Sequence, residues 1–224
     1  MCGRFLLAVD PADLQDAFPQ FIFQNGIEQR FNIAPTQPIL VVPNNSSFKT
    51  DHFLWGLIPA WAKDPSIGSR MINARAETLS EKPSFRGPYK YHRCLIFSNG
   101  FYEWQEQPGS KSKTPFFIRL NNGKPFAFAG LWDEWHSPDG SQIKSCAIIT
   151  TNPNSLVATI HNRMPVILPS GAFSQWLDPS PQSSNSLQDL LIPYPADEMI
   201  ASPVSIYVNN PANNGPECIA GIDL

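Results

Sequence analysis

The sequence has 224 residues, a formal net charge of −3, 42% hydrophobic residues and 16% charged residues. This composition excludes a disordered chain, and the length predicts one domain over residues 1–224. No segment approaches the ~18 consecutive apolar residues of a membrane-spanning helix, so we expect no membrane contact. The four cysteines form no C-x-x-C pair, which favours a reduced, cytoplasmic protein, and we expect neither a metal site nor a cofactor.

Short elements are expected throughout, because the 23 prolines interrupt both helices and sheets. The first predicted element is a short helix that begins at Asp10-Pro11, where an N-cap residue precedes a proline and apolar residues follow at helical spacing. Runs rich in β-branched and aromatic residues then predict strands over residues 39–42, 53–58, 94–97, 116–120, 126–131 and 143–150.

Turn signals connect the later strands. Asn122-Gly123 and Pro138-Asp139-Gly140 each lie between two of these runs, which predicts an antiparallel meander. Residues 178–186, rich in serine and proline, are predicted to form a flexible surface loop. The fold class is therefore α+β, with a mainly antiparallel, barrel-like β-sheet core and a few short helices. These helices are expected over residues 74–79, 154–160, 170–177 and 187–191.

Charge is distributed unevenly along the chain. Residues 63–93 contain seven basic and three acidic residues, whereas residues 120–224 contain three basic and nine acidic residues. One face could therefore be basic enough to bind nucleic acid although the total charge is negative. The alternative is an ordinary solvated surface, which is the usual origin of such a charge run.

Cys2 carries the most reactive chemistry in the sequence. Because its side chain is small, we expect removal of Met1, which leaves an amine and a thiol on adjacent carbons. Such a pair can trap an aldehyde, since the amine forms a Schiff base and the thiol then closes a five-membered thiazolidine. An α-amine, with a pKa of ~7.8, is much less protonated near neutral pH than a lysine, and a nearby Arg4 could raise the thiolate fraction. The alternative is an inert second residue.

Six motifs occur in order along the chain and together resemble the SOS response-associated peptidase (SRAP) family, also called abasic site processing proteins. The resemblance spans residues 2–168 and implies a protein that senses abasic sites in single-stranded DNA, bonds to them covalently through its N-terminal cysteine and shields the lesion. The motifs are Met1-Cys2-Gly3-Arg4-Phe5, Arg30-Phe31-Asn32-Ile33-Ala34-Pro35-Thr36, Trp55-Gly56-Leu57-Ile58-Pro59, Asn73-Ala74-Arg75-Ala76-Glu77, Gly100-Phe101-Tyr102-Glu103-Trp104 and His161-Asn162-Arg163-Met164-Pro165.

The same resemblance implies four catalytic residues: Cys2 as nucleophile, Asn73 orienting the adduct, Glu103 as acid or base, and His161 in ring opening and Schiff-base chemistry. A closed-ring deoxyribose must open before an aldehyde exists, and Glu and His are the side chains most readily tuned to move the protons. Each has a structural alternative: Glu103 as a solvent-facing strand residue, His161 as a cap of a helix C-terminus, and Asn73 as a helix N-cap. Sequence spacing alone brings none of the four together.

Five further residues are expected to bind DNA. Arg4, Arg75 and Arg163 are candidate phosphate contacts because a guanidinium binds phosphate through two hydrogen bonds. Trp61 and Trp104 are candidate surfaces for base stacking. The alternatives are a structural ion pair for Arg4 and the hydrophobic core for most tryptophans, although Trp61 lies in a proline-flanked segment and is expected to be exposed.

Two other functions stay open at this point. An N-terminal cysteine can serve a peptidase or amidohydrolase, including autoproteolytic removal of Met1. A non-catalytic nucleic-acid-binding module would use the basic segment, with Cys2 incidental. On the favoured hypothesis the partner is single-stranded DNA that contains abasic sites, replication-fork proteins are candidates for recruitment, and the protein is expected to act as a monomer with lyase-type Schiff-base chemistry.

Overall fold

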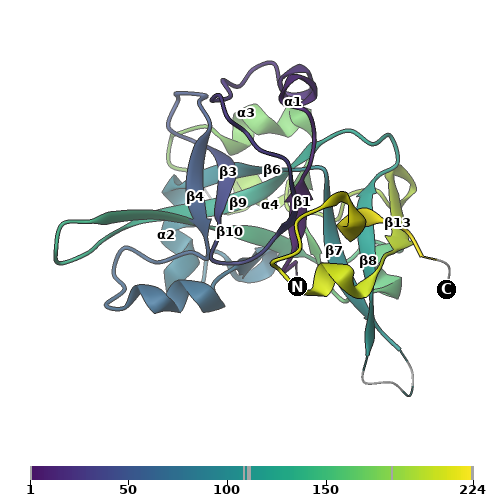
Figure 1. Ribbon diagram of the computed structural model, residues 1–224. Coiled ribbons are helices and arrows are strands. Elements are labelled where there is room, and N and C mark those ends of the chain that lie inside the picture. The colour runs from purple at the N-terminus through teal and green to yellow at the C-terminus, as the bar shows by residue number, and fades with distance from the viewer. Residues whose placement is uncertain (1, 108, 110–111, 183, 223–224) are drawn as a thin grey trace.

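The computed structural model describes residues 2–107, 109, 112–182 and 184–222. Its largest element is a closed five-stranded barrel, in which each strand pairs with the next and β9 returns to pair with β10 (Figure 1). Four of the five junctions are antiparallel and the β10–β4 junction is parallel, which confirms the mainly antiparallel, barrel-like core. Around the ring the strands are β10 (Gln142–Thr151), β4 (Asp51–Trp55), β3 (Pro38–Pro43), β6 (Arg93–Ser98) and β9 (Phe126–His136).

A second, antiparallel sheet lies beside the barrel, and the start of the chain lies between the two (Figure 1). Its strand order is β13 (Met199–Pro203), β8 (Lys113–Leu120), β7 (Gly100–Glu106), β1 (Phe5–Leu7) and β2 (Arg30–Ile33). Three short strands extend the barrel: β5 (Asn73–Arg75) and β11 (Met164–Pro165) pair with β10, and β12 (Ile167–Leu168) pairs with β9.

Aromatic packing joins the two sheets. The Phe5 ring lies 5.1 Å from Trp55 and 5.8 Å from Phe128, measured between centroids, and all three side chains are buried. At the start of β7, a Cβ on Gly100 would lie 2.2 Å from the Phe117 ring, so this close approach requires glycine. The Phe5 contacts fix β1 against the barrel, and Phe101 of β7 likewise packs on Phe128, with ring centroids 6.2 Å apart. The starts of β1 and β7 lie close to residues of the candidate site.

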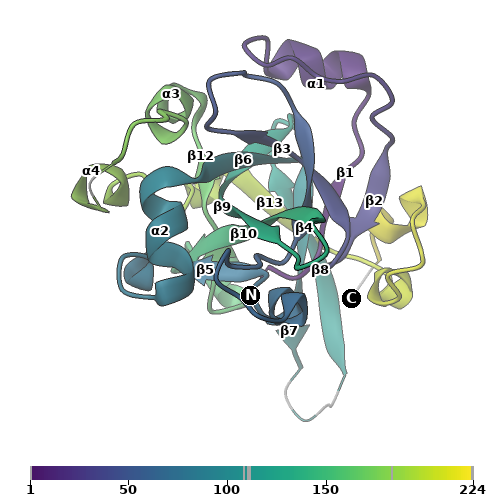
Figure 2. The same cartoon turned by 90° about the vertical axis from the view of Figure 1, so that its left-hand side faces the viewer.

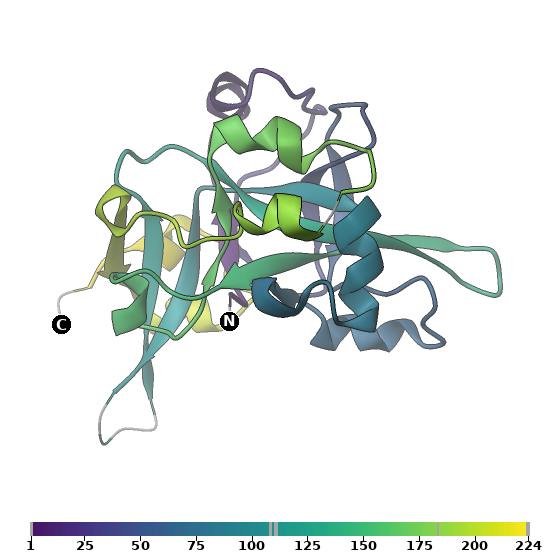
Figure 3. The same ribbon diagram turned by 180° about the vertical axis from the view of Figure 1, so that it is seen from behind.

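The helices cover one side of the barrel, as Figures 2 and 3 show for α2 (Pro83–Tyr91), α3 (Phe173–Trp176) and α4 (Ser184–Gln188). Helix α1 (Pro11–Ala17) begins as predicted, since the Asp10 carboxylate accepts a hydrogen bond from the Ala12 N–H. Helix α2 was not predicted, because Gly87 and Pro88 interrupt its sequence pattern. The helix expected over residues 170–177 is present as η4 (Ser170–Ala172) followed by α3.

Three of the expected helices differ from the structure. Residues 73–75 form β5 because they pair with β10, and the 3₁₀ helix η2 (Ala76–Thr78) follows. Only one 3₁₀ turn, η3 (Val157–Thr159), forms within residues 154–160, and α4 begins at Ser184, earlier than predicted. These short segments take the conformation that their tertiary contacts select, which local propensity does not determine.

One of the two turn predictions is wrong. Pro138-Asp139-Gly140 joins β9 and β10 as a hairpin, as expected. Asn122-Gly123 does not form a hairpin, because β8 belongs to the second sheet whereas β9 belongs to the barrel. The sequence signal marks a turn, but it does not say whether the strands on either side pair.

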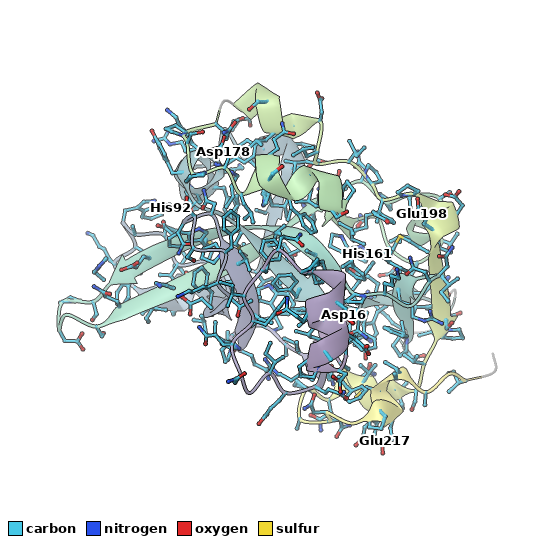
Figure 4. The ribbon with its side chains drawn as sticks, turned by 90° about the horizontal axis from the view of Figure 1, so that it is seen from above. Asp16, His92, His161, Asp178, Glu198 and Glu217 are labelled. Carbon is cyan, nitrogen blue, oxygen red and sulfur yellow. The ribbon has the colours of Figure 1, made fainter. Side chains whose placement is uncertain are left out.

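The segment predicted as a flexible loop is partly ordered by hydrogen bonds. The Asp178 carboxylate accepts hydrogen bonds from the backbone N–H and the hydroxyl of Ser180. Figure 4 shows Asp178 next to helices on the helical side of the barrel. Residue 183 lies outside the described residues, as does Met1, whose removal is expected from the sequence. Within the described part of the chain, no helix has the length and apolar character that crossing a membrane requires.

Candidate active site

Strand pairing places the start of the chain beside Glu103. Phe5 pairs with Phe101, and the Tyr102 N–H donates to the Arg4 carbonyl at 2.9 Å, so residues before Arg4 continue alongside Glu103. The Cys2 side chain is fully buried, and its thiol lies 4.0 Å from the Arg4 carbonyl. Burial, together with the negative charge of Glu103, raises the pKa of the Cys2 thiol above its ordinary value. The expectation that Arg4 increases the thiolate fraction is therefore wrong, and the sulfur is held as a thiol.

Asn73 contacts Cys2 directly. Strand β5 runs parallel to β10, with Asn73 beside Ile148, and this pairing aims the Asn73 amide at the start of the chain. The Asn73 Nδ2 donates to the Cys2 carbonyl at 2.9 Å, while its Oδ1 is buried without a hydrogen-bond partner among the described residues. Because Asn73 lies within β5, the alternative role as a helix N-cap is wrong. Its free acceptor can instead receive an N–H from the reacting nitrogen.

Glu103 and His161 form a pair of titratable groups at the same place, with His161 on the segment that follows β10. Their nearest atoms, Glu103 Oε2 and His161 Nε2, are 4.0 Å apart. Burial is the main cause that raises the pKa of Glu103 to about 7, and burial also lowers the pKa of His161. The Arg163 N–H donates to His161 Nδ1 at 3.0 Å, and the Arg163 carbonyl lies 3.3 Å from the same nitrogen, so these backbone contacts hold the ring with Nε2 facing Glu103.

This arrangement decides between the structural alternatives for both residues. Glu103 is 3% exposed, so it is not a solvent-facing strand residue. The His161 backbone N–H donates to the Val157 carbonyl at 2.8 Å and closes the η3 turn, but the imidazole ring itself points toward Glu103. A carboxyl group whose pKa is raised to about 7 and an imidazole whose pKa is lowered can exchange a proton with a ligand, as general acid–base chemistry requires.

The raised pKa of Glu103 predicts a pH-dependent cost to stability. Because this pKa rises from 4.5 to about 7 on folding, proton binding stabilises the fold fully below pH ~4.5, and this contribution is lost as the pH rises through about 7. We expect Glu103→Gln, which cannot titrate, to exceed the native protein in stability by about 3 kcal/mol at a pH well above 7, with no gain near pH ~4.5. Urea denaturation across this range checks the difference, and a gain that does not change with pH would contradict it.

A cavity of about 400 Å³ opens next to His161. It lies between the last residues of β7 with the first residue of β8, on one side, and the segment over residues 158–162 on the other. The Gln105 side chain spans the two walls, because its Nε2 donates to the Thr159 carbonyl at 2.8 Å. The polar lining includes Gln105, Glu106, Lys113, Thr159, His161 and Asn162.

The five expected DNA contacts do not gather at one place. Arg75 and Trp61 are exposed, the latter by 60%, as expected for Trp61. Arg163 forms a two-point ion pair with Glu77, at 2.7 and 2.9 Å, and its side chain is only 13% exposed. Two of the five, Arg75 and Trp61, are therefore the ones freely presented to solvent.

Arg4 and Trp104 hold the C-terminal segment. Strand alternation turns both side chains to the face of the second sheet opposite Glu103. The Arg4 Nη1 donates to the Val208 carbonyl and to Asn32 Oδ1, and the Trp104 Nε1 donates to Asn209 Oδ1 at 2.8 Å. The ion pair expected as the structural alternative for Arg4 is not among these contacts, and its guanidinium instead donates to neutral oxygens of Asn32 and Val208.

Two polar residues at or near the site were missed in the sequence. Asn32 is 2% exposed and links Arg4 to the carbonyls of Val208, Asn210 and Asn213. It lies inside the second of the six motifs, and an amide flanked by apolar strand residues is a usable signal for a buried polar contact. Lys113 lines the cavity beside His161, and its sequence neighbours give no comparable signal.

Comparisons with known proteins cover the whole site. The family model described as "SOS response associated peptidase (SRAP)" matches residues 1–211. The chain is 48% identical over 222 residues to the abasic site processing protein YoqW of Bacillus subtilis, which covers 98% of this chain and 99% of that protein. It is 37% identical over 199 residues to the abasic site processing protein HMCES of Rattus norvegicus, which covers 76% of this chain and 56% of that protein. A crystal structure of a protein from Bacteroides thetaiotaomicron matches with a TM-score of 0.87 and 27% identity, over 99% of this chain and all of the other.

Proposed function

Because this chain belongs to the SRAP family, we propose that it processes abasic sites in single-stranded DNA by capturing the sugar aldehyde covalently with Cys2. The observation that carries the proposal is the meeting of Cys2, Asn73, Glu103 and His161, which come from four separate parts of the chain. The names of the relatives, abasic site processing proteins, support the same substrate.

Opening of the sugar is the first chemical step. In the closed ring, a base removes the proton from the hydroxyl on C1′, an acid protonates O4′, and the C1′–O4′ bond breaks to give the aldehyde. A carboxyl group with a pKa of about 7 can protonate O4′ near neutral pH, and the adjacent neutral imidazole of His161 can accept the proton of the C1′ hydroxyl at the ring nitrogen that carries no hydrogen. The close pair of Glu103 and His161 therefore suits ring opening.

Capture follows at the same carbon. Once Met1 is removed, the Cys2 amine adds to C1′ and water leaves, which gives an imine. The thiol then adds to the imine carbon and its proton passes to nitrogen, so that the complete reaction joins protein and DNA with loss of one water. Because the pKa of the Cys2 thiol is raised, the sulfur still carries its proton when the imine forms, and Glu103 is close enough to transfer this proton from sulfur to nitrogen.

Asn73 orients the nucleophile. Its Nδ2 fixes the Cys2 carbonyl, and its Oδ1 has no other hydrogen-bond partner among the described residues. An amide keeps one charge state over the whole pH range of the reaction, so it can hold the amine and later the adduct without competing for the transferred proton.

Intact mass spectrometry tests the proposal. The purified protein is measured alone and after incubation with a single-stranded oligonucleotide that carries one abasic site. We expect a protein lacking Met1, and then a species heavier by the oligonucleotide mass less one water. An oligonucleotide without the abasic site should add no mass. Turnover of a peptide or amide library without any DNA adduct would instead favour an N-terminal-cysteine peptidase.

A further inference from the structure

The cavity beside His161 has the position expected for a second binding site. It opens between the β7–β8 hairpin and residues 158–162, and His161 forms part of its wall. A volume of about 400 Å³ lies in the range of small-ligand pockets. Since the hydrogen bond from Gln105 to Thr159 joins the two walls, the cavity is a built feature of the fold and does not depend on one loop.

Lys113 supplies the positive charge of this cavity. Its Nζ forms an ion pair with Glu106 Oε1 at 2.8 Å, and the two side chains are 50% and 81% exposed. An ion pair as exposed as this one contributes little, so a stronger anion can replace Glu106 at small cost. The Lys113 charge also acts on both Glu103 and His161, which places it within electrostatic range of the catalytic pair.

Two of the other candidate cations near the site are already engaged. Arg163 is bound at two points by Glu77, and the Arg4 guanidinium faces the C-terminal segment. A DNA strand captured at Cys2 continues on both sides of the abasic sugar, and each side begins with a phosphate. On the side of His161, Lys113 is the cation that lines the cavity, whereas the exposed Arg75 lies on β5 with Asn73 and is absent from the lining.

We propose that this cavity is a subsite for the nucleotide next to the abasic sugar on one side, with Lys113 binding its phosphate. The inference rests on the proposed capture of abasic DNA, and it goes further by assigning a cavity and a cation to one flanking nucleotide. The walls suit this ligand, because Asn162 offers an exposed amide to a base edge and Lys113 offers a single mobile cation to the phosphate.

The test uses three abasic oligonucleotides and three variants. The abasic sugar is placed internally, at the 5′ end, or at the 3′ end, so that flanking nucleotides are present on both sides or on one side only. Lys113→Ala removes the cation, and Glu106→Gln removes its competitor. Lys124→Ala is the matched control, since Lys124 is exposed beyond the opposite end of β8. Rates of adduct formation are measured at subsaturating DNA over a range of salt concentrations.

On the internal site, we expect Lys113→Ala to lower the rate of adduct formation about fivefold and to reduce the slope of log rate against log salt by about one. On one of the two substrates with a terminal abasic sugar, the one that lacks the nucleotide bound in the cavity, the variant should react as fast as the native protein. Glu106→Gln should raise the rate on the internal site, and Lys124→Ala should leave it unchanged. Equal effects of Lys113→Ala on all three substrates, or none, would overturn the subsite. Absence of any adduct with the native protein would instead reject the capture chemistry, so the two failures are distinguishable.

Discussion

Replacement of Cys2 by alanine should abolish the denaturant-resistant adduct with abasic DNA and leave non-covalent binding within about twofold, because a single buried thiol contributes little to DNA affinity. The variant still loses Met1, since alanine is also small, and so it keeps an N-terminal amine beside Asn73. That amine can form an imine but cannot close the thiazolidine. Borohydride should therefore trap Cys2→Ala on DNA, whereas the untreated sample should show no adduct after denaturation.

A second variant separates the amine from the thiol. A lysine inserted between Met1 and Cys2 blocks removal of the methionine, which leaves the Cys2 thiol present but its nitrogen in a peptide bond. We expect neither a stable adduct nor a borohydride-trapped one. Denaturing gel electrophoresis and mass spectrometry detect the adduct for each variant. A denaturant-resistant adduct with either variant would show that Cys2 is not the point of attachment.

The chemistry of the site could be predicted from residue types, but its geometry could not. A cysteine after the initiator methionine already suggests capture of an aldehyde. Asn73 reaches Cys2 only because β5 pairs in parallel with β10, a contact between residues about 75 positions apart that no local pattern encodes. The prediction of a helix at 74–79 fails for the same reason, since this pairing with the barrel overrides the helical propensity of the segment.

Burial is the second property that the sequence did not reveal. Glu103 stands in a strand-like run where a carboxylate usually faces solvent, yet the contact between the second sheet and the barrel encloses it. The same enclosure raises the pKa of the Cys2 thiol, opposite to the effect expected from a neighbouring Arg4. The Arg4 side chain does not approach the Cys2 thiol, because it is hydrogen-bonded to Val208 and Asn32. A contact between the two ends of the chain, such as that of Arg4 with Val208, cannot be predicted from the spacing of motifs in the sequence.

The basic segment over residues 63–93 is a surface feature with one exception. Six of its seven basic side chains are exposed, which fits either nucleic-acid binding or plain solvation. The seventh, Arg93, is fully buried at the start of β6. Its guanidinium donates hydrogen bonds to the backbone carbonyls of Trp176, Tyr89, Lys90 and Asp178. Arg93 therefore fastens the helical side of the molecule to the barrel and is not available to DNA.

Arg93→Leu should lower the free energy of unfolding by about 4 kcal/mol, because several buried carbonyls lose a charged donor and the exposed helices supply no replacement. Arg93→Lys, which keeps the charge but offers fewer donors in a less suitable geometry, should lose about half as much. Arg86→Leu on the exposed face of α2 is the control, with an expected change within about 0.5 kcal/mol. Urea denaturation measures all three, and the folded Arg93→Lys protein should bind single-stranded DNA as the native protein does. Destabilisation by Arg93→Lys no larger than that of Arg86→Leu, or a loss of DNA affinity without a loss of stability, would place Arg93 on the binding surface instead.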